Sequence, residues 1–162
     1  PGLHPYPYFG QETATRKPVS SLNWGIAARK CVVGALLAAS LTMGIEVFFS
    51  FFIVAAAIGG SLTGAVIAVF VLMLGGVGIF CFGVGYKVEA QGWLTGLITA
   101  ALWAFIFRPL YIAVLSFIIS ARISLSAIFN SYVLVFIFVF FLPLGVLAGW
   151  LGEKRATTGL RF

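Results

Sequence analysis

The chain has 162 residues and a formal net charge of +6 at neutral pH; 62% of its residues are hydrophobic and only 9% are charged. Soluble domains are roughly 45–50% apolar and about 25% charged. This composition, with a mean hydropathy of +1.14, therefore excludes a water-soluble fold and predicts an integral membrane protein.

The first 24 residues are more polar and hold four of the six prolines, in stretches such as HPYPYFG. Each proline restricts itself and the residue before it, so we predict an extended Pro/Tyr-rich N-terminal tail over residues 1–24. The tail has no apolar h-region of the kind found in signal peptides. We therefore expect the first apolar segment to act as an uncleaved signal anchor.

Four apolar segments follow, over about 27–57, 62–86, 92–119 and 132–151. Each reaches the roughly 20 residues that a bilayer-spanning helix needs. Barrel strands would alternate in polarity, whereas these runs are apolar on every side, so helices are favoured. We predict an all-α, four-transmembrane-helix bundle over residues 25–155, followed by a C-terminal tail over 156–162.

The connection before the last segment, SARISLSAIFNS, is more polar than its neighbours. It predicts a short interfacial helix with Arg122 facing the headgroups. A three-helix arrangement in which residues 112–131 are re-entrant is the alternative topology.

Basic residues are concentrated at one side of the predicted bundle. With four spans, that side carries eight bases and the opposite side only Arg122; the eight are Arg16, Lys17, Arg29, Lys30, Lys87, Lys154, Arg155 and Arg161. The positive-inside rule then predicts that both termini are cytoplasmic, or face the equivalent compartment of an organelle. We interpret the net charge as this orientation signal, and we expect no nucleic-acid partner.

Two opposite charges lie deep in the predicted spans. Glu46 is 16 positions beyond Lys30, and Arg108 is 16 positions beyond Gly92, where the third segment enters from the same side. Both should lie about 24 Å from that side. Because an unpaired charge in lipid is costly, we predict an intramembrane ion pair or polar cluster of Glu46 and Arg108, with Ser50 and Thr42 as further members.

Three roles stay open for this cluster. The pair could fix helix register, it could take part in proton or ion movement, or the two charges could reach the outer headgroups separately. Pro109 follows Arg108, removes one backbone donor and frees the carbonyl around Phe105, so a kink could turn Arg108 inward.

Glycine and phenylalanine divide the apolar surface. Gly60 and Gly64 form a GxxxG pattern at the start of the second segment, and Gly92 and Gly96 form another at the start of the third. We predict these four as helix-packing glycines, either within a tight bundle or on a docking face for another helix. The Phe-rich stretches FFSFF (48–52) and FIFVFFL (136–142) suit lipid contact, and a bound lipid, pigment or quinone is a further expectation for these faces.

The residue inventory limits the chemistry. His4 is the only histidine, there is no Asp, and the two cysteines, Cys31 and Cys81, show no CxxC spacing. These counts exclude a bis-histidine haem, a di-iron bundle and a Ser-His-acid set within the spans. We expect no enzyme activity, no metal and no cofactor, and we interpret both cysteines as small packing residues.

The stretch GGVGIFCFGVGYKVEAQGWLTGLITAALWAFIF joins a Gly-rich helix end, a short charged turn and the GWLTG that opens the next helix. Together with LPLGVLAGWLGEKR it resembles a family of small four-helix membrane proteins of unknown function from Gram-positive, spore-forming bacteria. The resemblance covers about residues 29–155. It implies a plasma-membrane setting and no known activity.

These features predict a multi-pass protein of a bacterial plasma membrane or an organellar inner membrane. The primary hypothesis is a non-catalytic accessory subunit that contacts other membrane subunits or a second copy of itself. The alternative is a small oligomeric transporter or channel that uses Glu46.

Overall fold

The computed structural model describes residues 23–58, 62–120 and 131–158, and this part of the chain is helical throughout apart from Asn23 and a short turn. Its elements, in order, are α1 (Trp24–Ile58), α2 (Leu62–Val88), α3 (Gly92–Leu102), the π-helix η1 (Trp103–Phe107), α4 (Arg108–Ser120), α6 (Ser131–Phe136), the π-helix η2 (Ile137–Phe141) and α7 (Leu142–Thr158). The elements α3, η1 and α4 form one continuous helix, and α6, η2 and α7 form another.

Four helical stretches are long and apolar enough to cross a membrane: Trp24–Ser50, Thr63–Val88, Gly92–Ile118 and Leu134–Thr158. The prediction of an all-α protein with four candidate spans is confirmed. Residues 112–120 continue α4 as ordinary helix, and residues 121–130 of the re-entrant alternative lie outside the described residues, so that alternative stays a prediction. The N-terminal tail, Gly60 and the polar connection with Arg122 lie outside the described residues.

Two helix ends differ from the predicted ones. α1 begins at Trp24, inside the predicted tail, because Asn23 caps it: the backbone N–H of Ile26 donates to Asn23 Oδ1 at 3.3 Å. α7 runs past the predicted end at Leu151 to Thr158, so the predicted C-terminal tail starts as helix. The hydroxyls of Thr157 and Thr158 bond back to carbonyl oxygens one turn earlier, which is compatible with helix to its end.

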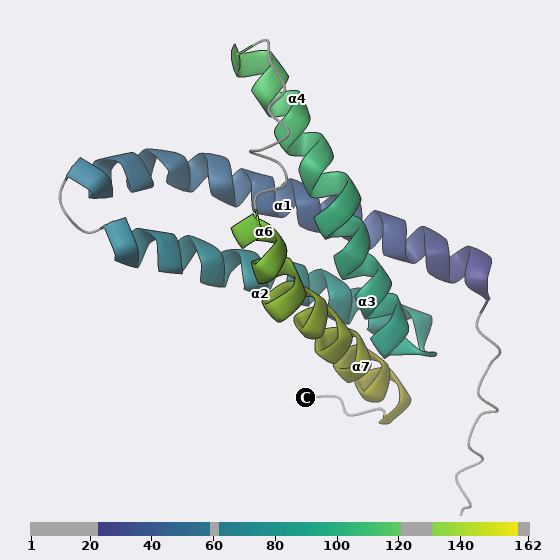
Figure 1. The fold of residues 1–162 in the computed structure, drawn as a ribbon. Helices are drawn as coiled ribbons and strands as arrows, with labels where there is room; N and C mark the ends of the chain where they lie inside the picture. Colours follow the sequence, from purple (N-terminus) through teal and green to yellow (C-terminus); the bar gives the residue numbers. More distant parts are fainter. Residues whose placement is uncertain (1–22, 59–61, 121–130, 159–162) are drawn as a thin grey trace, which may run out of the picture.

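The helices form two hairpins that cross each other (Figure 1). α1 and α2 make the first hairpin; the second consists of the α3–η1–α4 helix and the α6–η2–α7 helix. α7 packs against both α2 and α3, and α1 packs against α2 and α3. Beyond the crossing, α4 extends away from the first hairpin.

Small side chains make up much of the core. Ala35, Ala38, Ala39, Cys81 and Ala100 are fully buried, and larger residues such as Val77 and Trp103 fill the space between them. Small residues let helix backbones approach closely, which is how helices associate where lipid removes the hydrophobic driving force. Cys31 and Cys81 are both buried and free, in accord with the packing interpretation.

Both composite helices contain a π-helical turn just before a proline. In the first, the backbone N–H of Arg108 donates to the carbonyl oxygen of Trp103, and Pro109 is the next residue. In the second, the backbone N–H of Leu142 donates to the carbonyl oxygen of Ile137, and Pro143 is the next residue. A proline in a regular helix clashes with the carbonyl four residues earlier. Widening the preceding turn by one residue relieves this clash, so the expected irregularity at Pro109 takes the form of a π-turn, and it has a counterpart at Pro143.

Candidate functional site

The structure brings the two intramembrane charges together where α1 crosses the third helix. Arg108 Nη2 donates to Glu46 Oε1 at 3.1 Å, and their side chains are 18% and 27% exposed. Arg108 is the first residue after η1, so the π-turn sets the direction in which its side chain leaves the helix. Arg108 Nε is buried and has no hydrogen-bond partner among the described residues. The guanidinium is therefore only partly satisfied by Glu46.

Two further hydrogen bonds join α1 to the same region. Trp103 Nε1 donates to Thr42 Oγ1 at 3.1 Å, and both side chains are about fully buried. On the exposed side, the hydroxyls of Ser40 and Tyr111 lie 2.9 Å apart. We call the six residues of these three contacts the crossing cluster: Ser40, Thr42, Glu46, Trp103, Arg108 and Tyr111.

The predicted members of the cluster therefore separate. Glu46 and Arg108 contact each other directly. Thr42 is in the crossing cluster, but its hydroxyl donates to carbonyl oxygens of its own helix and accepts from Trp103. Ser50 donates to the carbonyl of Val47 at 2.6 Å, so its hydrogen is used within α1 and not on Glu46. A serine hydroxyl one turn along a helix often bonds to the backbone in this way.

The π-turns hold aromatic side chains against each other behind the crossing cluster. The rings of Trp103 and Phe141 are 4.6 Å apart, and those of Phe105 and Phe138 are 5.8 Å apart. Phe141 is 4% exposed and Trp103 is 1% exposed. This packing fixes the indole plane, so Trp103 N–H is directed at Thr42. Thus the Phe-rich stretch 136–142 is not entirely a lipid-facing surface.

A second region, at the base-bearing end of the bundle, consists of glycines on three helices. A Cβ added at Gly149 of α7 would meet the carbonyl oxygen of Gly92 and, at 2.8 Å, the Cα of Gly96, both on α3. A Cβ added at Gly85 of α2 would meet the carbonyl oxygen of Gly149. We call this set the glycine seam: Gly85, Gly92, Gly96, Gly145, Gly149 and Gly152.

Of the four predicted packing glycines, Gly92 and Gly96 lie in the glycine seam. Gly64 does not: it is exposed, and a Cβ added there meets no atom within 4 Å in the described structure. Gly64 therefore makes no close contact with another helix in the described part of the chain, and its role as a packing glycine stays a prediction. Gly60 lies outside the described residues.

Glu153 of α7 caps the start of α3 beside the glycine seam. Its two carboxylate oxygens accept the backbone N–H groups of Gln91 at 3.1 Å and Gly92 at 2.6 Å, at the start of α3. The N-cap position is Gln91, whose own side chain makes no capping bond. An acid from α7 therefore supplies the cap that the local sequence lacks, and it also balances the positive end of the helix dipole.

The sequence reasoning missed Trp103, Ser40, Tyr111 and Glu153. One signal was available for Trp103: the other tryptophans stand near helix ends, whereas Trp103 is in mid-span, and a buried indole N–H needs an acceptor. For Glu153 the signal was a helix start with no Ser, Thr, Asp or Asn at the cap. Among the described residues, no group of three His, Cys, Asp or Glu side chains converges to hold a metal.

The chain is thus of the class of all-helical proteins with four candidate membrane spans. Its helices are joined by the crossing cluster and the glycine seam. Comparison with protein-family models, with curated proteins and with solved structures finds no match to the chain.

Proposed function

We propose that the protein is a non-catalytic accessory subunit of a larger membrane assembly, in a bacterial plasma membrane or an organellar inner membrane with both termini on the side that carries the bases. The observation that carries this proposal is the position of α4. Beyond its first turn α4 leaves the bundle, and its outer residues Leu110, Val114, Phe117 and Ile118 are 50–73% exposed.

The tilt of a membrane helix is set by packing against its neighbours. Among the residues that the structure describes, α4 has few contacts with α1 and few with the other helices apart from η1, to which it is joined. A neighbouring subunit or a second copy lying along α4 would supply the packing that orients it.

The test is purification of the tagged protein from its native membranes in a mild detergent, followed by mass measurement of the intact complex. We expect partner subunits, or a second copy, at fixed stoichiometry. Ile118→Ala, at a residue that is 73% exposed on α4, should reduce this association, and the control Leu147→Ala, 57% exposed on α7, should not. Recovery of the wild-type chain as a monomer would overturn the proposal.

A second candidate is a small oligomeric transporter or channel that uses Glu46. It is favoured by the partial exposure of the ion pair and by the unbonded Arg108 Nε, beside two helices interrupted by π-turns. Irregular turns of this kind line the binding sites of many transporters.

This candidate predicts proton or sodium flux into liposomes that contain the purified protein. Glu46→Gln should abolish the flux, and Glu89→Gln, an exposed acid at the end of α2, should leave it unchanged. Absence of flux for the wild type, or equal flux for Glu46→Gln, would remove it.

A further inference from the structure

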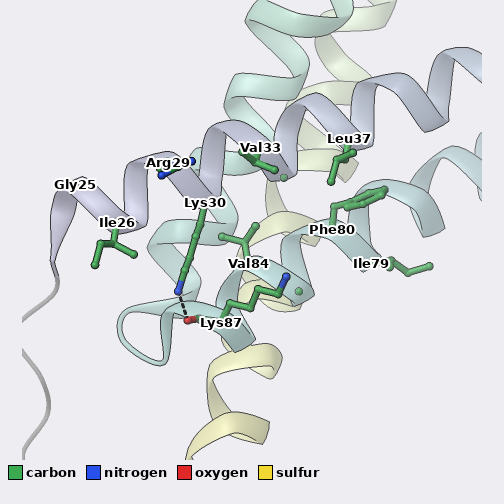
Figure 2. A pocket seen from close by; sticks show the side chains of 12 residues that line it. Gly25, Ile26, Arg29, Lys30, Val33, Leu37, Ile79, Phe80, Val84 and Lys87 are labelled. Carbon is green, nitrogen blue, oxygen red and sulfur yellow. Dashed lines mark hydrogen bonds between the residues drawn. The ribbon is translucent and has the colours of Figure 1, made fainter.

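We infer that the groove between α1 and α2 binds one anionic phospholipid, with its phosphate on Arg29, Lys30 and Lys87 and one acyl chain along the apolar walls. The inference is independent of the proposed function. The groove has a volume of about 720 Å³ and runs along the outer side of the first hairpin (Figure 2). Its walls come from both helices: Val33, Leu37, Ile79, Phe80 and Val84.

Three cations stand at one end of this groove. Lys30 Nζ, reaching from α1, donates to the backbone carbonyl oxygen of Lys87, and the side chain of Lys87 extends back along α2 (Figure 2). An ammonium has three donors, so Lys30 keeps two for a ligand while its position is fixed. In the described part of the chain, none of the three bases makes an ion pair with a carboxylate.

The nearby acids do not neutralise this end. Glu153 is used by the backbone N–H groups at the start of α3, and Glu89 is exposed and forms no ion pair among the described residues. Among the described residues, therefore, no carboxylate forms an ion pair with the three positive charges at the groove end. A phosphate is the complementary group, and basic sites between membrane helices recognise anionic headgroups by this chemistry.

The depth of the charges matches a lipid headgroup. Trp24, 55% exposed, begins α1 and is the kind of side chain that marks the membrane interface. Arg29 and Lys30 follow within about 9 Å along the helix axis, and Lys87 is next to the last residue of α2. From Lys30 to Leu37 the groove continues for about 11 Å between exposed apolar side chains.

The floor of the groove has room for a hydrocarbon chain. A Cβ added at Gly83 meets no atom within 4 Å, whereas one added at Gly34 would approach Val84 Cγ2 at 2.5 Å. The two helices therefore touch near Gly34 and leave open space at Gly83. A molecule with one charged end and an unbranched apolar body fits this arrangement, and a free phosphate would leave the apolar part unused.

The test measures lipids bound to the purified full chain by mass spectrometry after incubation with equal amounts of phosphatidylglycerol and phosphatidylcholine. We expect one phosphatidylglycerol to be retained preferentially. Because each basic side chain contributes about fivefold to affinity for anionic lipid, Arg29→Gln/Lys87→Gln should weaken the preference about 25-fold. Lys154→Gln/Arg155→Gln, at the same end of the bundle on α7, is the matched control and should retain it.

A second pair of variants tests the acyl chain and keeps every charge. Gly83→Leu fills the groove floor and should reduce retention of phosphatidylglycerol, whereas Gly75→Leu, in open space on the same helix, should not. These variants also decide the case if the charge variant does not fold.

Three results would overturn the inference. The first is equal retention of the two lipids by the wild type. The second is the same loss in the α7 control as in Arg29→Gln/Lys87→Gln, which would indicate general surface attraction. The third is full displacement of the lipid by inorganic phosphate together with no effect of Gly83→Leu, which would indicate a free-phosphate site.

Discussion

The glycine seam and the crossing cluster hold the third helix by opposite means: the seam joins α3 to α2 and α7, and the cluster joins η1 and α4 to α1. In the glycine seam, backbones of α2, α3 and α7 touch directly, and a Cβ at several positions would collide with a carbonyl oxygen. In the crossing cluster, polar side chains bridge α1 to η1 and α4, as in the contact of Arg108 with Glu46. The seam should therefore be sensitive to any added side-chain atom, whereas the crossing should be sensitive to the loss of one partner of a polar pair.

This difference also separates rigid from adjustable parts of the molecule. α7 is buried on its glycine face between α2 and α3, so the seam end has one arrangement. α4 extends from the crossing and has few contacts with the other described helices. A partner that packs along α4 would therefore act on the ion pair and leave the seam unchanged.

The largest effect is expected from a side chain placed in the seam. Gly149→Leu would bring a Cβ against the carbonyl oxygen of Gly92 and the Cα of Gly96, and neither backbone atom can move aside alone. Overpacking typically costs about 1–3 kcal/mol, and this site should reach about 3 kcal/mol because the backbone of α3 would have to be displaced. Thermal unfolding of the purified protein in detergent measures the loss.

The matched control is Gly75→Leu on α2, where an added Cβ meets nothing within 4 Å. It should change the melting temperature little. If Gly149→Leu and Gly75→Leu unfolded at the same temperature, close backbone packing in the glycine seam would not account for the stability of that region.

The crossing should respond to imbalance more than to loss of polarity. Arg108→Leu leaves Glu46 without its partner, and we expect the free energy of unfolding to fall by about 2 kcal/mol. This is less than the cost for a fully buried pair, because Glu46 is 27% exposed. The double variant Glu46→Gln/Arg108→Leu removes the unpaired charge, so it should be more stable than Arg108→Leu. A double variant at or below the single one in equilibrium unfolding would contradict this account.

A smaller effect is expected at the cap of α3. Glu153→Gln keeps one acceptor oxygen but loses the charge that faces the N-terminal N–H groups, so the free energy of unfolding should fall by about 1 kcal/mol. Hydrogen exchange of the backbone amides of Gln91 and Gly92 should also accelerate. Glu89→Gln removes an acid from the same turn without touching the cap, and unchanged exchange in that variant is the control. Equal acceleration in both variants would place the effect in net charge and not in the cap.

Much of this architecture could be predicted because helical rise converts sequence position into depth. Glu46 and Arg108 stand at equal offsets from the same side, and the structure brings them into contact. The four spans followed from length and polarity alone. These predictions need distance along the helix axis and nothing about rotation around it.

The remaining contacts could not be predicted because they depend on how each helix is rotated about its own axis. Helices that are apolar on all sides have no polar stripe to indicate the buried face. The GxxxG of α3 faces α7, whereas Gly64 of α2 faces outward, and the two patterns are indistinguishable in sequence. The contact of Trp103 with Thr42 and the reach of Glu153 to α3 depend in the same way on how helices distant in sequence turn toward each other.

The smallest expected effect is at the turn between α2 and α3. Glu89 has a φ of 57°, a left-handed conformation that costs an ordinary residue energy and that glycine adopts freely. Glu89→Gly should therefore stabilise the protein by about 0.5 kcal/mol, read as a rise in melting temperature. Glu89→Ala removes the same charge but keeps the Cβ, so it should give no gain. If alanine raised the melting temperature as much as glycine, the carboxylate and not the backbone would be the source of strain. A gain confined to glycine would show that the end of the molecule with the closest packing still holds strain in its connecting turn.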